Sequence, residues 1–202
     1  MNIYIVVEGA STEVKVYRNW IPLVNPSLVE VYDIDDVVAD NYYLISGGGY
    51  PNLFRVIKNA VEDIRLNPQF SRLVVSIDSE ENTFEEKNTE INDYIQGLNP
   101  TTEYRIIVQH FCFEAWALGN RKFGPSKPKN AELKAYKALH DVMLHDPELL
   151  PALPSEELNR AQFAAKYLKL AISDKAGHIT YSKGKPDVVA HPSYFEQLRA
   201  YP

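Results

Sequence analysis

Residues 2–13 read NIYIVVEGASTE, an apolar run followed by a polar loop. The apolar part, residues 2–7, is rich in β-branched side chains, which is typical of a buried strand. After the loop, apolar side chains recur at the spacing of a helix, at Val14, Tyr17 and Ile21. The stretch therefore predicts a strand, a loop and a helix, the first half of a βαβ unit.

Strands and helices alternate through the next hundred residues. Further strands are expected over 28–33, 42–46, 72–77 and 104–109, with helices after residue 49 and within 83–97. Such alternation predicts an α/β fold with a mainly parallel sheet flanked by helices. Beyond residue 119 only helical spacing is found. We therefore expect a sheet domain over 1–120, and a helical, basic C-terminal extension over 121–202 packed on it as one globular unit.

The composition narrows the possible cellular location of the protein. The 202 residues include a single cysteine, Cys112, so a disulfide within the chain and a Cys-based zinc site are both disfavoured. No apolar run approaches the roughly 20 residues that span a bilayer, and the N-terminus lacks a basic leader. These features predict a cytoplasmic protein with no membrane association.

Charge is unevenly distributed along the chain, whose net charge is −6. Residues 1–100 contain 7 basic and 16 acidic residues, a net charge of −9, whereas residues 101–202 contain 14 and 11, a net charge of +3. An uneven solvated surface would explain this split. It also fits an acidic metal-binding half beside a basic half that holds a phosphate chain.

Three acidic residues follow predicted strands, at Glu8, Asp78 and Glu114. Ligands of open parallel sheets bind at the carboxyl ends of the strands, so these side chains are expected near one edge. Glu80 lies two residues after Asp78, and an extended chain would point both carboxylates the same way. Clustered carboxylates repel unless a cation neutralises them, and oxygen ligands of this kind suit Mg²⁺ or Mn²⁺.

Structural roles compete with this hypothesis. An aspartate after a strand, such as Asp78, is often a helix cap or a turn former. Glu114 lies within an apolar stretch and needs a metal, a lysine or backbone donors as its partner. Cys112 is expected to be an inert core thiol and His110 a structural histidine. The Gly47–Gly49 run lacks the lysine of a P-loop and favours a tight turn.

Basic residues supply candidates for phosphate binding. Lys183 and Lys185 form a basic pair, and a lysine can offset the negative charge that develops in phosphoryl transfer. A second basic stretch could hold a nucleic-acid backbone; it contains Arg121, Lys122, Lys127 and Lys129. Most such side chains are simply solvated.

Four short motifs occur in an order that resembles Toprim-like proteins, especially the RloB-like group and the OLD-type nucleases. They are Glu8 to Glu13 (EGASTE), the glycines 47–49 followed by Asn52, Asp78-Ser79-Glu80 in the place of the DxD motif, and Cys112 to Trp116 (CFEAW). The resemblance covers about residues 3–120. Its one departure is Glu80, which stands where the motif has aspartate.

The resemblance implies a phosphodiester-cleaving site that requires Mg²⁺ or Mn²⁺. It assigns Glu8, Asp78 and Glu80 as metal ligands and catalytic residues, and Glu13 and Glu114 as additional ligands. Of three candidate lysines (Lys166, Lys169 and Lys183) we take Lys183 as the catalytic one. It also implies a separate ATPase partner, because the chain has no P-loop, and a role in bacterial defence against phage.

Three functions therefore compete. The leading one is a metal-dependent nuclease acting on DNA or RNA, with tRNA among the RNA substrates. The second is a non-catalytic Toprim-like subunit that acts with a partner ATPase or binds nucleic acid. The third is a phosphotransfer domain with Asp78 as its nucleophile, which predicts little need for Glu8.

Overall fold

The structure is a computed structural model and describes residues 1–153, 158–177 and 180–200. The chain divides into two compact units. The first unit contains residues 1–77 and 83–108, and the second contains residues 78–82 and 109–202. Within the part of the chain that the structure describes, no helix is both long and apolar enough to cross a membrane.

The first unit is built on a five-stranded sheet with the strand order β2-β3-β1-β4-β5. Its strands are β1 (Ile3–Val7), β2 (Val29–Val31), β3 (Asn41–Ser46), β4 (Arg72–Asp78) and β5 (Glu103–Gln109). The strand β1 pairs in parallel with both β3 and β4, and β2 pairs in parallel with β3. The prediction of an α/β fold with a parallel sheet flanked by helices is confirmed, and the architecture is consistent with a Toprim-like fold.

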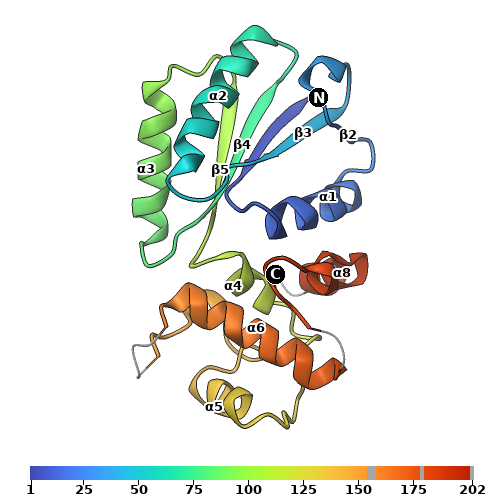
Figure 1. Cartoon of the computed structure of the whole chain (residues 1–202), viewed down its shortest axis with the longest axis vertical. Helices are drawn as coiled ribbons and strands as arrows, with labels where there is room; N and C mark the ends of the chain where they lie inside the picture. Colours follow the sequence, from blue (N-terminus) through green and yellow to red (C-terminus); the bar gives the residue numbers. More distant parts are fainter. Residues whose placement is uncertain (154–157, 178–179, 201–202) are drawn as a thin grey trace. The chain divides into compact units, whose positions relative to one another are not determined.

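Three helices cover the sheet, with α1 (Thr12–Val24) on one face and α2 (Asn52–Leu66) and α3 (Phe84–Gly97) on the other (Figure 1). A short 3₁₀ helix, Ile34–Asp36, lies between β2 and β3. The start of α3 is fixed by a capping box, in which the Thr83 hydroxyl and the Glu86 carboxylate each accept a backbone N–H from the other residue.

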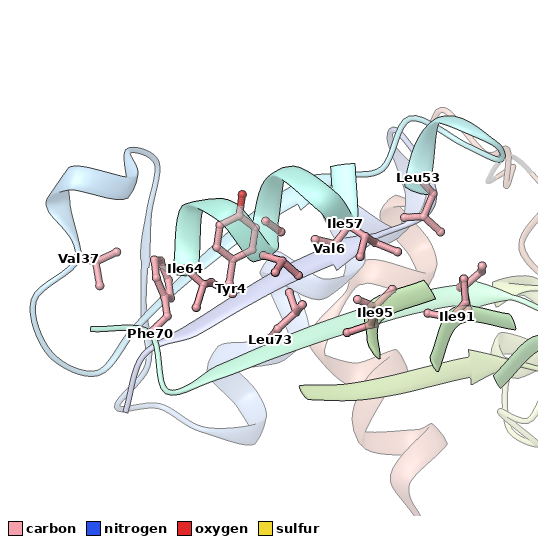
Figure 2. Close-up of a cluster of buried hydrophobic side chains, with 14 residues drawn as sticks. Tyr4, Val6, Val37, Leu53, Ile57, Ile64, Phe70, Leu73, Ile91 and Ile95 are labelled. Atoms are coloured by element: carbon pink, nitrogen blue, oxygen red, sulfur yellow. The ribbon is translucent and has the colours of Figure 1, made fainter. Parts of the chain in front are cut away.

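Alternate side chains of β1 enter two separate hydrophobic clusters. Tyr4 and Val6 pack with α2 and α3, in the cluster that includes Ile57 and Ile91 (Figure 2). Ile5 and Val7 belong to the cluster on the α1 face. A strand that is apolar on both faces must lie inside the sheet, which explains why residues 3–7 form an unbroken apolar run.

The second unit is helical. Its helices are α4 (Phe113–Leu118), α5 (Ala131–Leu139), α6 (Arg160–Ala176), α7 (Asp187–Ala190) and α8 (Pro192–Arg199), with a 3₁₀ helix over Pro147–Leu149. Helix α6 begins with a capping box formed by Asn159 and Gln162. Aromatic rings pack between α5 and α6, where Tyr136 meets Phe163 edge to face with ring centroids 4.8 Å apart.

The division between the units falls at a different place from the predicted boundary at residue 120. Helix α4 packs on α6, and the Tyr194 hydroxyl of α8 donates to the Ala117 carbonyl of α4 at 2.8 Å. Residues 109–120 therefore belong with the helical part of the chain. Residues 78–82 join them because the backbone N–H groups of Ser79 and Glu80 donate to the carbonyls of Gln109 and Phe111.

Candidate functional site

Glu8 lies in the first unit, directly after β1. Its backbone N–H donates to the Ser76 carbonyl of β4 at 3.0 Å, and its carbonyl accepts from the Gly49 N–H at 2.9 Å. The side chain is only partly buried. Glu8 is thus held at the carboxyl end of β1, beside β4, by backbone bonds on both sides.

The glycine run beside Glu8 is a tight turn, as the sequence predicted. Gly47 N–H donates to the Val7 carbonyl at 2.6 Å, and the Ser46 hydroxyl donates to the Gly9 carbonyl at 3.0 Å. Gly48 and Gly49 adopt φ values of +71° and +81°, a backbone region that side chains disfavour. The turn fixes the loop that carries Glu8.

Glu13 lies on the first turn of α1 and is buried. A Cβ atom placed on Gly9 would collide with the Glu13 carboxylate. The loop of the EGASTE motif therefore requires glycine at position 9 so that the Glu13 side chain can fold back over the backbone. The Glu13 carboxylate therefore lies against Gly9, the residue that follows Glu8.

Asp78 is the last residue of β4, belongs to the second unit and is 8% exposed. Its Oδ1 accepts the backbone N–H of Phe113, the first residue of α4, at 3.0 Å. Asp78 therefore caps a helix, which is the structural role named above as the alternative to metal binding. A carboxylate oxygen at a helix start also interacts favourably with the helix dipole.

The chain is not extended beyond Asp78, so the strand alternation from which a common direction of Asp78 and Glu80 was expected does not apply. Ser79 is fully buried, and its hydroxyl accepts the Phe111 N–H at 2.8 Å and bonds His110 Nδ1 at 3.0 Å. Glu80 adopts a left-handed φ of +52° and is exposed, whereas Asp78 is buried. Backbone bonds between 78–82 and 109–111 override the strand periodicity here, and His110 has the structural role that was expected.

Glu114 lies in the first turn of α4 and is 1% exposed. Its Oε1 accepts a hydrogen bond of 2.7 Å from the Tyr181 hydroxyl, and its Oε2 lies 3.9 Å from Lys183 Nζ. The prediction that this carboxylate needs a partner is therefore met by a phenol and a lysine. The structure brings Lys183, the lysine chosen from the sequence, to Glu114.

Cys112 lies near both Asp78 and Glu114 in the second unit. Burial raises the pKa of its thiol well above the usual value, and the nearby Glu114 and Asp78 carboxylates raise it further. Both carboxylates thus share the surroundings of one side chain. The expected core position of Cys112 is confirmed, because it is fully buried and its thiol faces the Ala161 carbonyl at 3.5 Å. That the thiol is inert stays a prediction.

The predicted site residues fall into two groups. Asp78, Glu114 and Lys183 belong to the second unit, as does the exposed Glu80, whereas Glu8 and Glu13 belong to the first. Among the residues that the structure describes, no group of three or more His, Cys, Asp or Glu side chains is arranged to hold a metal ion.

Comparison with known proteins gives no relative. No family model, no curated protein and no solved structure matches the chain. Function must therefore be argued from the residues of this chain.

Tyr181 is the residue that the sequence analysis missed. It is 2% exposed and is bonded to Glu114, 67 residues earlier in the chain. The only local signal was its position two residues before Lys183, in a basic stretch where a buried aromatic residue is unexpected. Its pairing with Glu114 depends on tertiary structure, which no spacing rule predicts.

Proposed function

We propose that this protein is a Mg²⁺- or Mn²⁺-dependent nuclease that cleaves phosphodiester bonds of DNA or RNA. The observation that carries the proposal is the position of Glu8 and Asp78. They follow or end β1 and β4, which pair directly and in parallel. The carboxyl ends of such neighbouring strands are where α/β proteins bind their ligands.

The donor atoms are of the kind that a hard divalent cation prefers, since Glu8, Glu13, Asp78, Glu80 and Glu114 offer only carboxylate oxygens. Asp78 and Glu114 are both buried in the second unit, where an anion is costly unless it is compensated. Glu8 and Asp78 are the principal ligands of the proposal. Glu80, Glu13 and Glu114 are its additional ligands, and the exposure of Glu80 suits contact through water.

The metal and Lys183 would have separate parts in hydrolysis. A metal held by Glu8 and Asp78 would supply positive charge to the scissile phosphate and would lower the pKa of an attacking water. Lys183 offsets the negative charge that develops on the phosphate oxygens, and its side chain is 65% exposed. Water adds to phosphorus and loses a proton, the P–O bond to one nucleoside breaks, and the leaving oxygen takes up a proton.

The motif resemblance supports a proposal for the family, the cellular location and the biological role of this activity. We propose a cytoplasmic nuclease of the Toprim-like class, close to the RloB-like and OLD-type group. The chain acts in defence against phage with a separate ATPase partner. Support for a cytoplasmic setting comes from the single, reduced and buried cysteine.

The proposal is tested by incubating the purified protein with plasmid DNA, single-stranded DNA and total RNA including tRNA. Each substrate is tested with Mg²⁺, with Mn²⁺ and with EDTA. We expect cleavage of at least one substrate with metal and none with EDTA, and loss of cleavage in Glu8→Ala. The proposal fails if no substrate is cut, or if Glu8→Ala cuts as well as the wild type.

A second candidate is a non-catalytic Toprim-like subunit that binds a partner ATPase or a nucleic acid. The observation that favours it is the use of Asp78 Oδ1 as the cap of α4, together with the pairing of Glu114 to Tyr181. Calorimetric titration with Mn²⁺ separates the two candidates. Heat of binding that is lost in Asp78→Asn supports the nuclease, and no binding at millimolar Mn²⁺ supports the regulatory subunit.

A further inference from the structure

Residues 181–185 form a tight turn that presents two lysines. The Lys185 N–H donates to the Ser182 carbonyl at 2.9 Å, and the same two residues form an antiparallel bridge. Lys183 and Gly184 occupy the two corner positions of this turn. Residues 182–185 are exposed, whereas Tyr181 and Pro186 on either side are buried.

Tyr181 anchors this turn to the buried acid of α4. Tyr181 is 2% exposed, and its hydroxyl donates to Glu114 Oε1. Lys183 approaches Oε2 of the same carboxylate. An exposed turn that is fixed at its base keeps its lysines in place, and binding a ligand then costs less conformational entropy.

Lys185 differs in its pairing from several other cations of the second unit. Lys166 pairs with Glu132, Lys137 with Asp141 and Arg160 with Glu81. Within the part of the chain that the structure describes, the Lys185 ammonium forms no ion pair. A Cβ atom added to the neighbouring Gly184 would meet nothing within 4 Å, so the space beside the turn is open.

The net charge of the second unit indicates that a polyanion would bind it only at a local cluster of cations. Residues 78–82 and 109–202 contain 13 basic and 13 acidic residues, so the second unit has no net charge. A neutral unit attracts a polyanion only through a local cluster of cations. The turn supplies such a cluster, with two lysines separated by a glycine.

We propose that the turn 181–185 binds the phosphate backbone of DNA or RNA, with Lys185 as a phosphate contact and Tyr181 as the anchoring residue. The inference rests on the proposed function and deepens it, because it assigns the element that holds the substrate. The ligand chemistry is a phosphodiester chain, for which DNA and RNA are the two sources.

The test measures binding without cleavage. Fluorescence anisotropy in EDTA gives the affinity for three labelled probes of one sequence: single-stranded DNA, single-stranded RNA and duplex DNA. We expect Lys185→Ala to weaken binding of the preferred probe roughly fivefold, and to lower the salt dependence of log K by about 0.7 to 0.9. Tyr181→Phe, which removes only the hydroxyl, weakens binding in the same direction.

Lys134→Ala is the matched control, because Lys134 is an exposed lysine on α5 of the same unit. It should bind as the wild type does. The inference is overturned if the wild type binds none of the probes, if Lys185→Ala or Tyr181→Phe binds like the wild type, or if Lys134→Ala loses as much affinity.

This result is separable from the test of the nuclease. A protein that binds the probes through Lys185 but cuts nothing with Mg²⁺ or Mn²⁺ contradicts the nuclease and keeps the turn. A protein that cuts nucleic acid while Lys185→Ala binds normally keeps the nuclease and contradicts the turn.

Discussion

The Tyr181 hydroxyl donates a 2.7 Å hydrogen bond to Oε1 of Glu114, inside the second unit of the chain. The carboxylate is almost fully buried, and Lys183 is the cation beside its other oxygen. This bond joins the stretch after α6 to the start of α4. It is therefore a stabilising contact as well as part of the candidate site.

Tyr181→Phe should lower the free energy of unfolding by about 1.5 to 3 kcal/mol, because it leaves a buried, charged acceptor without its donor. Urea unfolding at neutral pH measures the change. Tyr50→Phe is the control, since Tyr50 is exposed and its hydroxyl bonds Glu90 at 3.3 Å. The control should change stability by no more than about 0.5 kcal/mol. Equal losses in both variants would contradict the anchoring role.

The core between the sheet and α3 gives a second prediction. Ile91 is fully buried in the cluster shown in Figure 2. Ile91→Ala should cost about 2 to 5 kcal/mol, because it removes buried methyl groups and leaves a cavity. Ile107→Ala on β5, where the side chain is 36% exposed, should cost about 1 kcal/mol or less. The comparison uses the same urea titration, and equal costs would contradict the assigned packing.

We predict that the folded protein loses stability at alkaline pH because Tyr42 becomes ionised. Burial, followed by the nearby Glu30 carboxylate, raises the pKa of Tyr42 from 10.0 to about 12. The folded state therefore favours the protonated phenol. This stabilisation is complete below pH 10.0 and is lost as the pH rises towards about 12, by an amount of order 2 to 3 kcal/mol.

Unfolding free energies measured across this pH range should fall less steeply in Tyr42→Phe than in the wild type. Tyr32→Phe is the control, because the Tyr32 side chain is 74% exposed. The assignment is wrong if both variants retain the slope of the wild type.

Cys112 should be unreactive in the folded protein. Its thiol is fully buried, and its pKa is raised by burial and by two neighbouring carboxylates, so little thiolate forms. A disulfide reagent such as DTNB should modify it only when the protein is unfolded in urea. Rapid modification of the native protein would contradict the packing of Cys112 between α4 and α6.

The sequence predicts the fold of the first unit well, because the physical signals there are local. Residues 3–7 are apolar on both faces of a strand, and Leu53, Ile57 and Ile64 repeat at helical spacing on α2. The exception is the edge strand β2, which covers only Val29–Val31 of the expected 28–33. Its short pairing with β3 depends on neighbours that are distant in sequence.

The candidate site is less predictable. The positions of Glu8 and Asp78 at strand ends follow from the pattern, and so does the need of Glu114 for a partner. The direction of Glu80 does not follow, because a backbone bond to Phe111 turns the chain after Asp78. Tyr181 could not be assigned either, since its role comes from a contact with Glu114 that only the folded chain creates.

The most direct test of the central claim is the cleavage rate of Asp78→Asn. Asparagine keeps a side-chain oxygen that can accept the Phe113 N–H and cap α4, but it removes the negative charge that a metal ligand needs. Rates are measured with Mn²⁺ on the substrate that the wild type cuts best, and Glu85→Gln, an exposed position on α3, is the control. We predict a melting temperature close to that of the wild type and a cleavage rate lower by about 100-fold or more. Cleavage by Asp78→Asn at the rate of the wild type would contradict the account.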